Sequence, residues 1–229
     1  IEEPEPPAPV TEPEKTFEEV LDEHPVSIQV NGQWQTFPNA KAAEEASYEE
    51  YKANLRRNAK NFRITDEHLG EGGPKAKFQA NVNAIRLLKE LEAAGQQASP
   101  EQQEVLSRYV GWGGLSDAFD PEKPAWALEY AQLKELLTPE EYAAARSSTL
   151  NAHYTSPTVI QAIYEAVDRM GFETGNILEP SMGVGNFFGM LPEKMRNSRL
   201  YGVELDPVSG RIAKQLYPKA DITVGGFET

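Results

Sequence analysis

The sequence predicts an α/β fold, a truncated parallel sheet preceded by a mainly helical region. Three observations lead to this expectation. Short apolar runs alternate with helical patterns from about Thr149 onward, amphipathic helical patterns fill most of residues 40–146, and the first 24 residues are acidic and rich in proline. We therefore divide the chain into residues 1–24, a disordered acidic linker, residues 25–148, a mainly helical region with a short β-hairpin, and residues 149–229, the first part of a sheet-forming domain.

The composition narrows the possible classes of protein. Residues 1–24 carry nine acidic residues and one lysine, so much of the net charge of −14 lies in the linker. That charge says little about what the folded part binds. The chain has no cysteine, no apolar run long enough to cross a membrane and no signal peptide, so we expect a cytoplasmic protein without a membrane partner. His24, His68 and His153 show no ligand spacing, so no metal is expected. The ends at Ile1 and Thr229 suggest a piece cut from a longer parent protein.

The first ordered elements are a predicted hairpin and a long helix. Alternating apolar residues in 26–30 and 33–37 flank Asn31-Gly32, a pair that tolerates the positive φ angles of a tight turn. The following helix covers about 40–61.

That helix carries a short basic stripe. Lys52, Arg56 and Lys60 stand four residues apart, on one face, and Arg63 follows just beyond the helix. The stripe is either a solvated face near a helix C-terminus, which we favour, or a surface that contacts DNA phosphates.

Glycines and helix caps divide the rest of the helical region. A glycine-rich turn over 69–77 opens a helix at about 76–94, and the turn lacks the Gly-Lys-Ser/Thr ending of a nucleotide-binding loop. Ser99 caps a helix that runs to about Val110. The glycines of Gly111-Trp-Gly-Gly114 let the backbone approach a neighbouring element or a ligand. Trp112 is expected to anchor the core rather than to stack on a base. A further helical stretch over about 126–144 is broken near Thr138-Pro139.

Helices and strands alternate in residues 149–229. We expect a helix over 157–169, strands over 176–179, 199–204 and 221–224, a short helix over 186–190 and a helix from Asp206-Pro207 to Leu216. This order predicts a parallel sheet that binds its ligand at the carboxyl ends of the strands. In the helix over 157–169 the residues expected to face inward are Val159, Ile160, Ile163, Ala166 and Val167.

The loop after the first of these strands has the features of a nucleotide site. Gly183 and Gly185 allow a tight turn and a close approach of the backbone to a ligand, and the next helix begins directly behind them. Glu204 ends the second strand, 19 residues after Gly185, where an acid can accept hydrogen bonds from both ribose hydroxyls. The same features occur in dinucleotide sites.

Three details favour S-adenosylmethionine over NAD as the ligand. Phe188 stands where a dinucleotide loop has its third glycine. Glu179 would repel a pyrophosphate but can pair with the ammonium group of a methionine moiety. Tyr154-Thr-Ser-Pro157 precedes the first helix instead of following the sheet. A version of the fold that binds nothing is the remaining alternative.

These segments together resemble a known enzyme family. Asn151-Ala-His-Tyr-Thr-Ser-Pro157, Leu178-Glu-Pro-Ser-Met-Gly-Val-Gly-Asn-Phe187 and Gly202-Val-Glu-Leu-Asp-Pro207 are similar to the motifs of N6-adenine DNA methyltransferases of the gamma order. The resemblance implies a Rossmann-like class I methyltransferase fold. It implies that Thr155 holds the methionine carboxylate, that Glu179 faces the methionine part and that Glu204 binds the ribose. The cofactor-binding set expected is Tyr154, Thr155, Pro157, Glu179, Pro180, Ser181, Gly183, Gly185, Asn186, Phe187, Glu204, Leu205 and Phe227.

A narrower resemblance covers much of the helical region. Residues 61–65, 72–77 and 108–115 are similar to the large methylase–helicase proteins of bacterial conjugative elements and phages. This resemblance implies a bacterial cytoplasmic parent that binds DNA and carries a helicase part. One departure concerns the third strand, because Gly226 stands where the family often has an aspartate that contacts the cofactor adenine. Phe227 could still pack on that ring, and Glu228 could supply the acceptor.

The motif that handles the target base does not occur in the 229 residues. The family uses Asn/Asp-Pro-Pro-Tyr/Phe to hold and stack on the flipped adenine, and the sequence has Pro-Pro only at Pro6-Pro7. We therefore expect this chain to bind the cofactor, weakly, and not to methylate DNA by itself. Two other functions stay open, a DNA- or partner-binding module that uses the fold as a scaffold, and a methyltransferase acting on protein or RNA.

Overall fold

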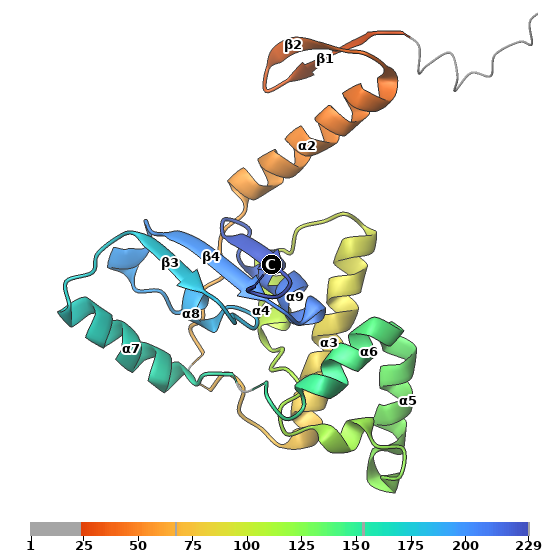
Figure 1. The fold of residues 1–229 in the computed structure, drawn as a ribbon, viewed down its shortest axis with the longest axis vertical. Helices are drawn as coiled ribbons and strands as arrows, with labels where there is room; N and C mark the ends of the chain where they lie inside the picture. The colour runs from red at the N-terminus through yellow and green to blue at the C-terminus, as the bar shows by residue number, and fades with distance from the viewer. Residues whose placement is uncertain (1–23, 67, 153, 229) are drawn as a thin grey trace, which may run out of the picture. The chain divides into compact units, whose positions relative to one another are not determined.

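The structure is a computed structural model in which residues 24–66, 68–152 and 154–228 are described, without the side chains of residues 51–58. Except for His24, the predicted linker lies outside the described residues. The chain separates into two compact units, residues 1–57 and 58–229, and each is described by itself (Figure 1).

The first unit contains the predicted hairpin and all of the long helix except its last residue. Strands β1 (Val26–Val30) and β2 (Gln33–Phe37) pair antiparallel, and Asn31 and Gly32 both have positive φ, as the turn requires. Helix α2 (Ala40–Asn58) begins where expected and ends three residues earlier than expected. The Asn39 side chain accepts a hydrogen bond from the Ala42 N–H at 2.9 Å and caps it. The backbone N–H of Asn31 donates to Glu50 at 2.6 Å, which ties the turn to the helix.

The second unit begins with a group of helices and single helical turns. They are α3 (Pro74–Ala93), α4 (Pro100–Ser107), η1 (Ser116–Phe119), η2 (Pro124–Trp126), α5 (Ala127–Leu136) and α6 (Pro139–Ser148). The predicted start signal at Ser99 is present as a full capping box with Gln102 for α4, and the structure shows a second box, Thr138 with Glu141, at the start of α6. The predicted break near Thr138-Pro139 is confirmed, since α5 ends at Leu136 and α6 starts at Pro139.

A three-stranded parallel sheet follows in the same unit. Its elements are α7 (Pro157–Arg169), β3 (Asn176–Glu179), α8 (Asn186–Gly189), η3 (Glu193–Met195), β4 (Arg199–Glu204), α9 (Pro207–Leu216) and β5 (Asp221–Val224). The strand order is β3-β4-β5, with Ile177 opposite Leu200 and Gly202 opposite Ile222. The α/β class and the parallel direction of the strands are therefore confirmed.

One hydrophobic core joins the helices to the sheet. Helix α9 contacts β4 and β5, and helices α3, α4 and α6 contact α9. Trp112 is 1% exposed and packs edge-on against Phe78 and Phe119, so the prediction that it anchors the core is confirmed. Asn81, which the helical pattern did not single out, is fully buried and holds the chain before this tryptophan. Its amide donates to the Gly111 carbonyl at 2.6 Å and accepts from the Val110 N–H at 2.9 Å.

The inward face predicted for α7 is partly wrong. Ile160 and Tyr164 are buried, whereas Val159 and Ile163 are 49% and 41% exposed and Ala166 is also exposed. The Tyr164 hydroxyl donates to the carbonyl of Phe187 at 2.7 Å, so the helix turns this face towards α8. Apolar spacing located the helix correctly but did not tell which of its two apolar edges packs.

Candidate functional site

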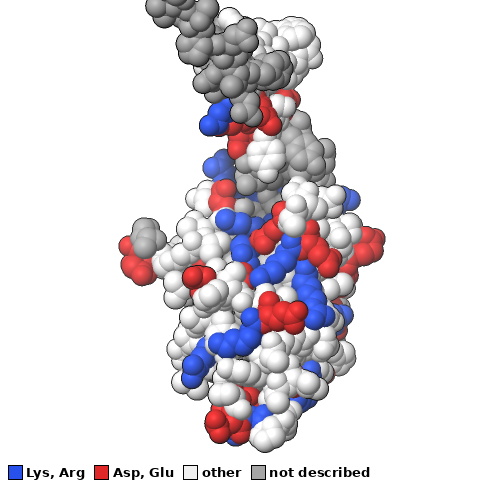
Figure 2. Space-filling model, turned by 90° about the vertical axis from the view of Figure 1, so that its right-hand side faces the viewer, with Lys and Arg blue, Asp and Glu red and all other residues white. Residues whose placement is uncertain are grey.

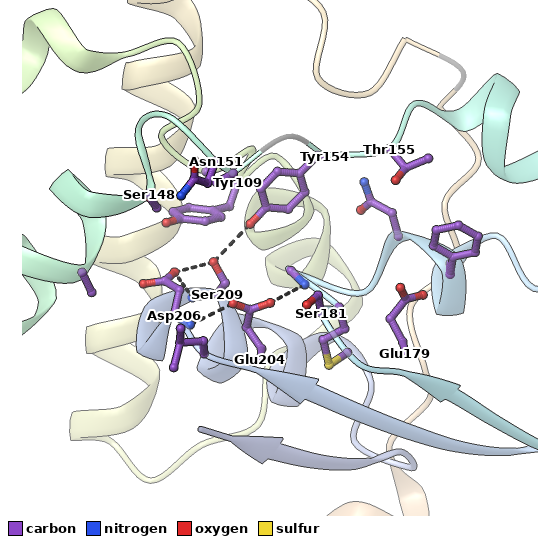
Figure 3. A pocket seen from close by; sticks show the side chains of 18 of the residues that line it. Tyr109, Ser148, Asn151, Tyr154, Thr155, Glu179, Ser181, Glu204, Asp206 and Ser209 are labelled. Atoms are coloured by element: carbon purple, nitrogen blue, oxygen red, sulfur yellow. Dashed lines mark hydrogen bonds between the residues drawn. The ribbon is translucent and has the colours of Figure 1, made fainter. Parts of the chain in front are cut away.

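A cavity of about 580 Å³ lies at the carboxyl ends of β3 and β4, where the sheet was expected to bind a ligand. Its volume is within the range usual for cofactor sites. The sheet side supplies the loop after β3 and the residues that follow β4. The opposite side comes from α6, from the segment around Gly111 and from the segment before α7 (Figure 3). All lining residues belong to the second unit.

The loop after β3 is shaped by two glycines with positive φ. Gly183 has φ +55 and Gly185 has φ +85, and a Cβ at either position would collide with a tyrosine ring. At Gly183 it would lie 2.8 Å from Tyr154, and at Gly185 it would lie 2.5 Å from Tyr217. Gly183 therefore lines the cavity, whereas Gly185 lets the chain turn into α8 over a buried tyrosine.

Glu204 ties this loop to the end of β4. One carboxylate oxygen accepts the Gly183 N–H at 2.6 Å and the other accepts the Asp206 N–H at 2.8 Å (Figure 3). Burial raises the pKa of Glu204, and the backbone N–H groups of Asp206 and Gly183 oppose that shift. A carboxylate has about four acceptor positions, so Glu204 is fixed in place and can still accept hydrogen bonds from a diol.

Glu179 stands at the end of β3 in a different environment. Its carboxyl lines the same cavity, and burial raises its pKa to about 7. Its side chain thus changes charge near neutral pH. A cationic ligand group beside it would favour the ionised form.

Tyr154 lines the cavity and packs against the segment around Gly111, which lines it as well. Its ring lies between two glycines, because a Cβ at Gly111 would come within 2.5 Å of it and a Cβ at Gly183 within 2.8 Å. Its hydroxyl forms a hydrogen bond of 3.1 Å with Ser209, and burial raises its pKa well above the usual value, so the hydroxyl stays protonated. The sequence allowed Gly111 to approach either a neighbouring element or a ligand. The Tyr154 ring is the neighbouring element that it approaches.

Most of the residues that the sequence singled out for the cofactor line this cavity, and four do not. Those that line it are Tyr154, Thr155, Glu179, Ser181, Gly183, Asn186, Phe187, Glu204 and Leu205. Pro157 lines a neighbouring cavity of about 340 Å³, which Tyr154 and Thr155 share. Pro180 and Gly185 line neither of these cavities, nor does Phe227, which is 61% exposed.

Several lining residues were not among the predicted cofactor-binding residues. Tyr109, Gly111, Ser148 and Asn151 come from the helical region or its end, and Asp206 and Ser209 come from the start of α9. Asp206 was recognised from the sequence as the start of a helix, and its cap is present, since it accepts the Ser209 N–H at 2.8 Å. No local pattern marks Tyr109, because its place depends on how the helical region packs on α9.

The structure describes only part of the predicted basic stripe. The side chains of Lys52 and Arg56 are not among those that the structure describes, and Lys60 is exposed. Arg63 is 47% exposed at its side chain and lies 4.0 Å from Glu193. On the face of the second unit shown in Figure 2, basic and acidic side chains are interleaved. Contact with DNA through these four residues therefore remains a prediction.

The described residues show neither a metal site nor a membrane span. No group of three or more His, Cys, Asp or Glu side chains is placed to hold a metal ion in the described part of the chain. None of the helices found there is long and apolar enough to cross a membrane.

Two known proteins share sequence with this chain. It is 25% identical over 159 residues to the Defense against restriction protein B of Escherichia phage P1, a match that covers 69% of this chain and 6% of that protein. It is 43% identical over 58 residues to the Type II methyltransferase M.CvrRI of Paramecium bursaria Chlorella virus XZ-6E, which covers 25% of this chain and 15% of that protein. The chain thus spans a small part of either relative. No protein-family model and no solved structure matches it. The similarities suggest a methyltransferase-related family.

Proposed function

We propose that this chain is the cofactor-binding part of an S-adenosylmethionine-dependent DNA methyltransferase that acts on adenine N6. The observation that carries the proposal is the pair of carboxylates, Glu179 and Glu204, that line one cavity at the ends of neighbouring parallel strands. One carboxylate suits a cation and the other suits a diol. An amino acid joined to a ribose carries both groups.

The proposal assigns a role to each end of the cavity. Glu179 pairs with the ammonium group of the methionine part. Burial destabilises the ionised carboxyl of Glu179, and a neighbouring cation offsets that cost. Glu204 accepts the two ribose hydroxyls. Thr155, in the segment before α7, holds the methionine carboxylate, as the resemblance implies, and Leu205, which lines the cavity, offers apolar surface to the adenine. The fold would then be the beginning of a Rossmann-like class I methyltransferase domain.

When bound, S-adenosylmethionine supplies a methyl group on a positively charged sulfur. The residues of this chain position it and shield it from water. Glu204, fixed by two backbone N–H groups, sets the position of the ribose, and the protonated Tyr154 hydroxyl closes the cavity from the side of the helical region. The 229 residues contain no Asn/Asp-Pro-Pro-Tyr/Phe motif, so we propose that contacts to the target base come from other parts of the parent protein.

The choice of DNA as substrate rests on sequence similarity. The Type II methyltransferase matches a quarter of the chain, and the phage protein matches 69% of it. A methyltransferase acting on protein or RNA would share the cofactor cavity, and the helicase part expected in the parent remains a proposal.

Equilibrium dialysis of the 229-residue protein with tritiated S-adenosylmethionine tests the proposal. We expect saturable binding that S-adenosylhomocysteine displaces and NAD does not. Displacement by NAD at equal concentration would reject it in favour of a dinucleotide site. A separate assay of methyl transfer to adenine-containing DNA should show no incorporation with this chain alone, and incorporation would refute the proposed need for the missing motif.

A further inference from the structure

Two buried polar atoms near the adenosyl end of the cavity have no hydrogen-bond partner. They are the hydroxyl oxygen of Tyr109 and one carboxylate oxygen, Oδ1, of Asp206. Both residues line the cavity. Unpaired buried polar atoms are costly in a folded protein and call for an explanation, of which a bound ligand is one.

Both side chains are held in position by their other contacts. The Tyr109 residue is 1% exposed, and its ring packs edge-on against Trp112 at a centroid distance of 6.3 Å. The second carboxylate oxygen of Asp206 accepts the backbone N–H of Ser209 at 2.8 Å and also the Ser209 hydroxyl. These contacts leave the two unpaired atoms buried in the cavity wall.

The two groups lie close together and differ in hydrogen-bonding character. Burial, and next the nearby charge of Asp206, raise the pKa of Tyr109 well above its usual value, so its hydroxyl is a donor. Asp206 offers an acceptor. Figure 3 shows Tyr109 and Asp206 at the same end of the pocket, on the side of Glu204 away from Glu179. A ligand group that satisfies both must present an acceptor beside a donor.

We propose that Tyr109 and Asp206 bind the polar edge of the cofactor's adenine, with Tyr109 donating to a ring nitrogen and Asp206 accepting from the exocyclic amino group. This inference rests on the proposed function and extends it. Adenine carries an N–H donor next to a ring-nitrogen acceptor, which complements the pair. With the ammonium at Glu179 and the ribose at Glu204, the adenine lies beyond Glu204, where this pair stands. Gly225 and Gly226, just after β5, have no side-chain acceptor, and the Glu228 carboxylate, which lies against Gly226, is exposed and does not line the cavity. Both atoms are nearly closed off from solvent, so binding requires a small rotation of the two side chains towards the cavity.

The role of Tyr109 is tested by Tyr109→Phe in the full 229-residue protein, using calorimetry with S-adenosylhomocysteine. We expect affinity to fall roughly tenfold, the order of one lost hydrogen bond. The melting temperature without ligand should fall little, because the removed hydroxyl lies near Ser209 and Trp112 but makes no hydrogen bond of good geometry with either. Tyr142→Phe is the matched control, a buried tyrosine of the same helical region that does not line the cavity, and it should leave the affinity unchanged. Unchanged affinity in Tyr109→Phe would overturn the proposal.

The role of Asp206 is tested by ligand preference. The wild-type protein should prefer S-adenosylhomocysteine over S-inosylhomocysteine, whose ring carries an oxygen in place of the amino group, by roughly tenfold or more. Asp206→Asn keeps an oxygen to cap α9 but presents an amide N–H₂ to the ligand, so the preference should shrink or reverse. Equal affinity of the wild-type protein for both ligands, or an unchanged preference in the variant, would overturn the adenine contact while leaving the proposed function intact. Failure of the wild-type protein to bind either ligand would overturn both.

Discussion

Glu179 and Glu204 end neighbouring strands, yet their carboxylates differ in what surrounds them. Glu204 accepts two backbone N–H groups, and Glu179 has a pKa raised to about 7 by burial. The sequence indicated both acids from their places after apolar runs. It did not indicate this difference, because backbone donors and burial depend on how the loop after β3 and the residues after β4 fold over each other.

The ionisation of Glu179 predicts a pH-dependent affinity. If Glu179 pairs with the ligand ammonium, binding needs the ionised carboxyl, which is the minor form below pH 7. The affinity for S-adenosylhomocysteine should then fall by about tenfold for each pH unit below 7. Calorimetry at pH 8 and pH 6 measures this, and Glu179→Gln should bind more weakly and lose this pH dependence. A pH-independent affinity in the wild-type protein would contradict the assigned role.

The same group makes a prediction for stability without ligand. The folded pKa of about 7 exceeds the ordinary value of 4.5, so the folded protein binds more protons between these values. Its contribution to the free energy of unfolding is present below pH 4.5 and is lost as pH rises to 7. The loss is about 1–3 kcal/mol. Urea unfolding of the wild-type protein and of Glu179→Gln across this range should differ by that amount, and parallel pH curves would exclude the raised pKa.

At the scale of elements, alanine substitutions at Gly111 and Gly114 distinguish the cost of a clash with Tyr154 from the cost of backbone strain. Gly111 has φ +69, and a Cβ there would lie 2.5 Å from the Tyr154 ring, whereas Gly114 has φ +74 and a Cβ there would meet nothing within 4 Å. Substituting alanine at either site carries a similar conformational cost, about 1 kcal/mol. Gly111→Ala should cost a further 1–3 kcal/mol or so from the clash. Chemical denaturation of both variants measures the difference, and equal losses would show that Tyr154 does not press on this segment.

Three helices meet at the buried carboxylate of Glu141 in α6. It accepts hydrogen bonds from Lys89 of α3 at 2.9 Å and from Arg211 of α9 at 2.5 Å. Burial alone would raise its pKa, but the Thr138 N–H and these two cations outweigh it and lower the pKa. The cluster links the helical region to the sheet through α9.

Removing that charge leaves Lys89 and Arg211 without their shared partner. Both are about one-third exposed at their side chains, so Glu141→Gln should cost about 1–3 kcal/mol rather than the full value for a buried pair. Glu193→Gln is the matched control, since Glu193 is 74% exposed and pairs with Arg196 on the surface, and it should cost less than about 1 kcal/mol. Thermal unfolding compares them. Equal effects would mean that the Glu141 cluster does not hold the helices on α9.

Local signals predicted the elements well because their causes are local. The Asn31-Gly32 turn, the Ser99 and Thr138 capping boxes and the strand–loop–helix of residues 176–189 all depend on neighbours in sequence. The packing face of α7 and the contribution of Tyr109 to the cavity depend on contacts between distant segments. The periodicity of α7 allowed two packing edges, and the structure uses the one with Ile160 and Tyr164.

At the scale of the whole molecule, the cavity belongs entirely to the second unit. None of its lining residues precedes Tyr109, and residues 58–229 form a compact unit of their own. A chain of residues 58–229 should therefore fold and bind S-adenosylhomocysteine with the affinity of the full 229 residues. Circular dichroism and calorimetry test this, and loss of binding by a folded truncated chain would show that residues 1–57 contribute to the site.

The central claim is that Glu204 binds the ribose of S-adenosylmethionine at the ends of β3 and β4. The most direct measurement is calorimetric titration of the 229-residue protein and of its Glu204→Gln variant with S-adenosylhomocysteine. The account predicts one site per chain in the wild-type protein, and an affinity at least about tenfold lower in the variant, because two hydroxyl contacts to a fixed carboxylate are lost. Equal affinity in the two proteins, or no binding by the folded wild-type protein, would contradict it.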